Sequence, residues 1–119
     1  MQVEATKFML WAQDMSRAVR FWNGTFGFPT RFYDEHWTEL DLGGPSLALH
    51  GGHDGSTRES GFSVQVKDLE GALTAIQAAG GTIVRNAEAR PNEPIRLAEV
   101  RDPEGNQFTV TEYVGDSRS

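Results

Sequence analysis

Aromatic, acidic and hydroxyl side chains occupy alternate positions in several short segments of the chain. In WTELDLGG, one alternate set is Trp37, Glu39 and Asp41, and in QFTVT it includes Thr109 and Thr111. Because successive side chains of a strand point to opposite faces, each set would lie on one face of a sheet. Indole rings stack on planar groups and attract cations, and a nearby carboxylate adds charge complementarity. These segments predict a surface that binds a small aromatic or cationic molecule.

Among the three histidines, His50 combines a predicted strand with this polar face. An imidazole with a pKa near 6.5 can act as a general base or as a hydrogen-bond donor. The alternative is a strand-end histidine that only makes a structural hydrogen bond, and His36 and His53, in turn-like or linker sequence, are expected to be structural or exposed. Together with Glu39 and Glu99, His50 could also form a site of two carboxylates and one imidazole that suits iron, manganese or zinc.

An internal repeat predicts the elements that position these side chains. A shift of 54 positions aligns Phe8 to Phe28 with Phe62 to Thr82, and the identical pairs mark a strand start, a helix cap, a helix face and a helix exit. In each copy an alternating strand is followed by an aspartate, Asp14 or Asp68, which is placed to cap a helix. Three further strands fit after each helix: residues 30–35, 37–42 and 46–50, then 82–85, 95–101 and 107–113. The unit is βαβββ, used twice.

The sequence therefore predicts an α+β fold in which tandem βαβββ modules form a curved mixed sheet around a cleft, with the helices on the outer face. We expect a single domain over residues 1–119, with module one at about 5–50, a linker at 51–61 and module two at about 62–114. The apolar alternates should face the helices, and the other set should line the cleft. The alternative for this second set is an ordinary solvated sheet surface. The predicted ligand-binding residues are Met9, Trp11, Gln13, Trp37, Glu39, Asp41, His50, Ser63, Gln65, Glu99, Thr109 and Thr111.

Charge and composition exclude several classes of protein. The chain has 11 Lys and Arg against 17 Asp and Glu, a net charge of −6, which would repel nucleic acid. It has no cysteine, so a disulfide framework and a thiolate site are excluded. Apolar runs fall short of the roughly 20 residues of a membrane helix, and the first ten residues lack a signal-type pattern. We expect a soluble cytoplasmic protein without a membrane partner.

Two motifs carry a resemblance to a known family. The segment AQDMSRAVRFWNGTFGF, with its D-x-x-x-A-x-x-F-W pattern, and the segment DPEGNQFTV resemble the glyoxalase/bleomycin resistance/dioxygenase family of the vicinal oxygen chelate superfamily. The resemblance covers about residues 5 to 114. It implies the duplicated βαβββ fold and a homodimer, because relatives commonly complete their clefts with the partner chain.

The resemblance also locates the metal-binding positions of the family. Its metal-dependent members hold a divalent ion with His, Gln or Glu at four strand positions, which correspond here to Lys7, Ala48, Gly61 and Thr109. None of these is a usual ligand, since a lysine amine must lose its proton before it binds a metal. A shift of two residues at Ala48 would instead select His50. We expect no metal and no other cofactor.

The resemblance leaves three functions open, because members of the superfamily differ in activity. The preferred prediction is a metal-free protein that binds a small aromatic or cationic molecule, similar to the drug-sequestering proteins of antibiotic resistance. The first alternative is a metal-dependent lyase, isomerase or dioxygenase with relocated ligands. The second is a structural or interaction domain whose cleft is vestigial.

Overall fold

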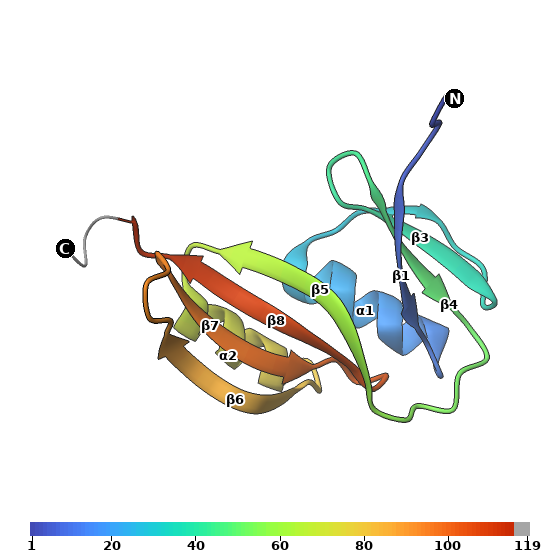
Figure 1. The fold of residues 1–119 in the computed structure, drawn as a ribbon. Coiled ribbons are helices and arrows are strands. Elements are labelled where there is room, and N and C mark those ends of the chain that lie inside the picture. The colour runs from blue at the N-terminus through green and yellow to red at the C-terminus, as the bar shows by residue number, and fades with distance from the viewer. Residues whose placement is uncertain (116–119) are drawn as a thin grey trace.

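A computed structural model of the chain describes residues 1–115 and contains two βαβββ units (Figure 1). The order of elements is that predicted from the repeat, and the fold class is α+β. The first unit comprises β1 (Lys7–Trp11), α1 (Met15–Phe26), β2 (Thr30–Phe32), β3 (Trp37–Asp41) and β4 (Ser46–His50). The second comprises β5 (Arg58–Val66), α2 (Leu69–Ala78), β6 (Thr82–Ala89), β7 (Ile95–Arg101) and β8 (Asn106–Tyr113).

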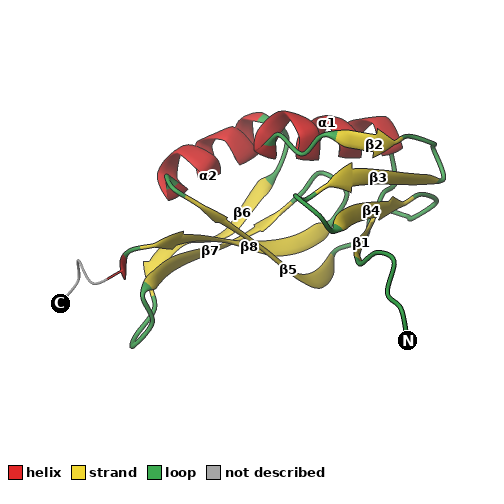
Figure 2. Ribbon diagram, turned by 90° about the horizontal axis from the view of Figure 1, so that it is seen from above, coloured by secondary structure: helices red, strands yellow, loops and turns green. Residues whose placement is uncertain are grey.

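The strands divide into two four-stranded mixed sheets, one from each unit. Their orders are β1-β4-β3-β2 and β5-β8-β7-β6. In each sheet the first strand pairs in parallel with the last strand of its unit, and the remaining pairs are antiparallel. Both helices lie on the same side of the sheets (Figure 2). The side of each sheet that faces away from α1 and α2 is called the open face below.

The helix boundaries follow from local capping chemistry. The Asp14 carboxylate accepts a hydrogen bond from the Arg17 amide at 3.2 Å, and Asp68 accepts one from Gly71 at 3.0 Å. Each aspartate thus satisfies an amide that has no partner within its helix, as the sequence predicts. Gly27 ends α1 in the left-handed region at φ 75°, where a glycine avoids the clash of a β-carbon.

One hydrophobic core runs through both units beneath the helices. Trp22 of α1 is fully buried, and its ring lies 4.7 Å from that of Phe108 and 5.7 Å from that of Phe62. Phe62 also contacts the Phe8 ring at 4.8 Å. Because these rings come from both units, the units stabilise each other through shared apolar burial.

The turn DPEG at residues 102–105 fastens the second unit to the first. Glu104 is fully buried, and one of its carboxylate oxygens accepts the backbone amides of Gln13 at 2.9 Å and Asp14 at 2.8 Å. Its other oxygen accepts the Arg17 Nε–H at 2.6 Å. These contacts, which the sequence does not predict, satisfy backbone amides at the start of α1.

Asn106 continues this contact along β1. Its side-chain carbonyl accepts the Trp11 amide at 3.0 Å, and its side-chain amide donates to the Trp11 carbonyl at 2.7 Å. The side chain therefore pairs with the end of β1 in the way that another strand would. The turn thereby fixes the backbone of Trp11.

Three strand boundaries differ by three or more residues from those predicted. β2 ends at Phe32 because Asp34 forms a turn in which its carboxylate accepts the His36 amide at 2.9 Å. β6 continues to Ala89, and β5 begins at Arg58, within the segment expected to be a linker. The serine and glycine of that segment resemble a loop in composition, yet Arg58 and Glu59 pair with β8. No helix of residues 1–115 is long and apolar enough to cross a membrane.

Candidate functional site

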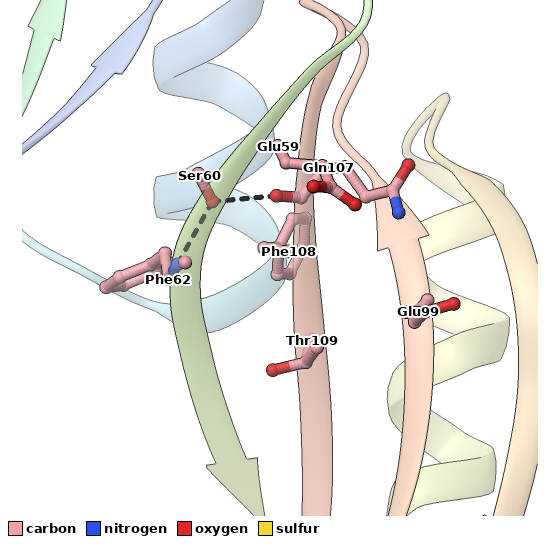
Figure 3. Close-up of a pocket in the computed structure, with 8 residues that line it drawn as sticks. Glu59, Ser60, Phe62, Glu99, Gln107, Phe108 and Thr109 are labelled. Carbon is pink, nitrogen blue, oxygen red and sulfur yellow. Dashed lines mark hydrogen bonds between the residues drawn. The ribbon is translucent and has the colours of Figure 1, made fainter.

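A pocket of about 260 Å³ opens on the second sheet between β5, β8 and β7 (Figure 3). All of its lining residues belong to the second unit. They are Glu59, Ser60, Gly61, Phe62, Glu99, Gln107, Phe108 and Thr109. The pocket combines two carboxylates, hydroxyl and amide groups and two aromatic rings, a mixture that orients and packs a small ligand.

An irregularity in β5 forms this pocket. Glu59 pairs with Gln107 and Ser63 pairs with Thr109, so three residues of β5 oppose the single residue Phe108 of β8. Gly61, in the middle, has φ +74° and space where a β-carbon would lie. The two extra residues form a bulge that interrupts the pairing of β5 with β8 beside the half-buried Phe62.

The Ser60 hydroxyl compensates for the interrupted ladder of the bulge. It donates to the Gln107 carbonyl at 2.7 Å and accepts the Phe62 amide at 3.1 Å, as Figure 3 shows. The hydroxyl thus bridges the two strands where the bulge interrupts their pairing. The shape of the pocket is therefore held by a side chain that sequence analysis placed in a linker.

The two carboxylates of the pocket differ in their partners. Glu99 forms an ion pair with Arg85 of the neighbouring strand, at 3.3 Å. The Glu59 carboxylate has no ion pair or hydrogen bond with any other group in residues 1–115. An unpaired carboxylate beside an aromatic ring is complementary to a cationic group.

The four positions that the resemblance assigns to a metal lie on both sheets. Lys7 and Ala48 belong to the first sheet, and Gly61 and Thr109 line the pocket of the second. The Thr109 hydroxyl donates to Ser63 Oγ at 2.7 Å. None of the four side chains offers the imidazole, amide oxygen or carboxylate that family members use.

The alternative metal site of His50, Glu39 and Glu99 is not assembled within one chain. No three His, Cys, Asp or Glu side chains of the described part come close enough together to hold a metal ion. Glu39 is on β3 and Glu99 on β7, in different sheets. The His50 Nδ1 lies 2.8 Å from the Gly51 carbonyl, so His50 makes the local hydrogen bond that was the alternative to a catalytic role.

On the open face of the first sheet, Glu39 is held by two donors. The Trp37 Nε1–H and the Lys7 ammonium each donate to its Oε2 at 2.9 Å. Hydrogen bonds, first from Trp37 and then from Lys7, hold the pKa of Glu39 below its usual value. The ammonium also lies 5.6 Å from the centre of the Trp37 ring. Glu39 and the Trp37 ring are therefore already in contact with a cation of the same chain.

Trp11 also lies on the open face and not between the sheet and α1. Its ring centre is 4.9 Å from that of His50 and 5.4 Å from that of His53, and the Arg58 guanidinium lies 5.0 Å away. Arg58 and His53 come from the segment predicted to be a linker. Neither Trp11 nor Trp37 lines the pocket of the second sheet.

The structure spreads the twelve predicted site residues over both sheets and brings only Glu99 and Thr109 into the pocket. Met9 is exposed on the open face of the first sheet, and Gln13 is exposed beyond the end of β1. Asp41 is paired with Arg31 at 2.6 Å. The others lie on β5 and β8, where Ser63 and Gln65 are exposed and Thr111 is buried.

Sequence analysis missed most of the lining, including Glu59 and Ser60, because β5 was expected to begin at Phe62. The alternation of Ser63 and Gln65, continued backwards, would have placed Glu59 on the same face. Phe62 and Phe108 belong to the apolar alternates that were expected to face the helices, and both pack in the core, Phe108 fully and Phe62 in part.

The chain matches the family model of the glyoxalase-like domain over residues 7–111. A comparison with curated proteins gave no match. Among solved structures, a member of the glyoxalase/bleomycin resistance protein/dioxygenase superfamily from Sphaerobacter thermophilus is 23% identical, with a TM-score of 0.74 and coverage of 94% of this chain and 98% of that one. TioX from Micromonospora is 22% identical, with a TM-score of 0.70 and coverage of 93% and 99%.

A third structure is the genomically encoded fosfomycin resistance protein FosX of Listeria monocytogenes. It is 13% identical, with a TM-score of 0.77 and full coverage of both chains. At these identities the structural similarities establish the fold alone. The family model, which spans nearly the whole chain, establishes more: the chain belongs to the glyoxalase-like domain family.

Proposed function

We propose that the protein binds a small cationic molecule with an aromatic part in the pocket of the second sheet, without a metal ion. The observation that carries this proposal is the unpaired carboxylate of Glu59 in a pocket whose inherited metal positions are Gly61 and Thr109. In the cell, the proposed role is to sequester a drug in the cytoplasm and thereby to contribute to antibiotic resistance.

The size and charge of the pocket support a cationic ligand. Ligand sites usually measure about 300–1,000 Å³, so a pocket of about 260 Å³ accommodates a small molecule or one ring system of a larger one. Glu59 supplies a carboxylate without an ion pair, and the half-buried Phe62 supplies ring surface for stacking or for a cation. The Gln107 side chain, although it accepts from Arg101 at 3.2 Å, offers its amide hydrogens for orientation.

A second copy of the chain is part of this proposal. Large apolar side chains are left on the surface, among them Met9 at 44% and Phe32 at 56% relative exposure. Register places both in one row across the open face of the first sheet, Met9–Ala48–Glu39–Phe32. Covering such a row with the partner chain would remove apolar area from water and enclose the ligand.

The proposal is tested by metal analysis and by titration. Protein purified without chelator is expected to carry far less than one equivalent of zinc, nickel, iron or manganese. Naphthylmethylammonium, a planar cation, is expected to bind, and Glu59→Gln is expected to weaken it about tenfold, the loss of one charge-assisted contact. Glu88→Gln, a matched loss of one charge on β6 outside the pocket, is expected to change affinity less than about twofold.

Two results would overturn the proposed function. One is a near-stoichiometric metal content that is abolished in His50→Ala. That result would favour the metalloenzyme alternative. The other is an affinity for naphthylmethylammonium that is absent at millimolar concentration or unchanged in Glu59→Gln.

A further inference from the structure

We infer that Arg58, held against the Trp11 ring, forms a separate site on the first sheet that binds the anionic group of a planar ligand such as an aromatic carboxylate. The inference rests on the proposed function only in taking the open faces of the sheets as the ligand-binding surface. Its charge preference is opposite to that of the pocket around Glu59.

The first observation is that Arg58 has no acidic partner. Its guanidinium lies 5.0 Å from the Trp11 ring centre, and within residues 1–115 it makes no ion pair. Five other arginines of this part of the chain each pair with a carboxylate: Arg17, Arg31, Arg85, Arg90 and Arg96. A guanidinium stacked on an indole keeps its N–H groups in its own plane, where they match both oxygens of a carboxylate.

The second observation is that two acidic side chains of the first unit and the connection, Glu39 and Asp54, already have partners. Glu39 accepts from both Lys7 and Trp37, so that it forms a neutral pair with the lysine. Asp54 accepts the Ser56 amide at 2.9 Å and lies 3.5 Å from the His53 imidazole. The Glu59 carboxylate, next to Arg58 in the chain, lines the pocket of the second sheet and makes no ion pair with Arg58. Arg58 therefore keeps a positive charge that no carboxylate of residues 1–115 pairs with, in a chain whose net charge is −6.

The third observation is the aromatic row beside Arg58. Register places Trp11, His50 and Trp37 in one line across three strands, and the His50 ring contacts both indoles, at 4.9 Å and 6.0 Å. Since His50 Nδ1 is within 2.8 Å of the Gly51 carbonyl, which can only accept, Nδ1 carries a proton. Such a row offers a flat ligand a surface next to the guanidinium.

These contacts favour an anionic ligand beside the two tryptophans, whereas the sequence predicts a cationic one. A cationic ligand would have to displace Arg58 from Trp11 or Lys7 from Trp37, since both ring positions are already occupied. An anion does not compete with these cations, and it can accept hydrogen bonds from the N–H groups of the Arg58 guanidinium. The corner formed by Trp11, His50 and Arg58 is thus specific for the opposite sign of charge from that of the pocket.

The experiment compares naphthoate with naphthylmethylammonium by calorimetry and by tryptophan fluorescence. Arg58→Gln is expected to weaken naphthoate about tenfold or more, without weakening the binding of naphthylmethylammonium and without a change in melting temperature. Arg58→Lys, which keeps the charge but loses the planar fork, is expected to recover only part of the affinity. Arg90→Gln removes the same charge from an exposed loop and is the matched control, with an expected change below about twofold.

The outcomes separate this inference from the proposed function. The inference is wrong if naphthoate fails to bind at millimolar concentration, if Arg58→Gln binds it like the unmodified protein, or if Arg90→Gln weakens it equally. The proposed function is judged by naphthylmethylammonium and Glu59→Gln alone. Either conclusion can therefore fail while the other stands.

Discussion

Asp102 should make the protein more stable at mildly acidic pH than at neutral pH. Its carboxylate is 4% exposed and accepts hydrogen bonds from Trp22 Nε1 at 3.1 Å and from the Asn106 side-chain amide at 2.8 Å. Burial nevertheless outweighs these donors and raises the pKa of Asp102 from 3.8 to about 6. Because the folded state binds the proton more tightly than the unfolded chain does, the stabilisation by this group is complete below the unfolded pKa and is lost as the pH rises through the folded pKa.

The magnitude follows from the two pKa values. Their difference corresponds to about 3 kcal/mol in the acidic limit, and the part gained between about pH 7.5 and about pH 5 is about 1.4 kcal/mol. Glu39, Asp41 and Glu70 have lowered pKa values, so their opposing effect is confined to more acidic solution. The window above about pH 5 therefore reports mainly on Asp102.

Urea unfolding at several pH values in this window, followed by tryptophan emission, measures the effect. The Asp102→Asn variant carries the same histidines and should lack the gain of about 1.4 kcal/mol on acidification. It should also be less stable overall, because each oxygen of the Asp102 carboxylate accepts two hydrogen bonds, and the amide nitrogen that replaces one oxygen can accept neither of its pair. Asp68→Asn, a conservative change at an exposed helix cap, is the control and should keep the gain. The reasoning is refuted if Asp102→Asn keeps it too, or if the unmodified protein loses stability over this window.

Three further predictions concern the turn, the tryptophans and the assembly. Glu104→Ala should destabilise the protein by about 3 kcal/mol, since it leaves the Gln13 and Asp14 amides without an acceptor and removes the partner of Arg17. A loss of stability below about 1 kcal/mol in urea unfolding would contradict the role of Glu104 in joining the two units. Trp11→Phe should leave the melting temperature nearly unchanged, whereas Trp22→Ala should lower the free energy of unfolding by about 3–5 kcal/mol, because Trp22 is buried. Equal effects of the two substitutions in calorimetry would show that Trp11 does not lie on the open face. Light scattering should give the mass of a homodimer at micromolar concentration, and a stable monomer would rule that assembly out.

The sequence determined those features that depend on neighbours along the chain. Alternation identified the core set of β1 and β3 and left Trp11 and Trp37 on the other face, because side chains of a strand point to opposite sides regardless of what covers them. Asp14, Asp68 and Gly27 marked helix ends through bonds and backbone angles that reach at most a few residues. The repeat fixed the order of elements and the fold class for the same reason.

Tertiary structure decided which polar groups meet. Glu104 lies about 90 positions from the amides that it binds, and Arg58 reaches Trp11 across a connection of irregular structure. Long charged side chains have many rotamers, so the sequence does not select their partner until packing brings one within reach. The pocket arises likewise from a register difference between β5 and β8, which depends on the pairing of two distant strands and not on the pattern of either one.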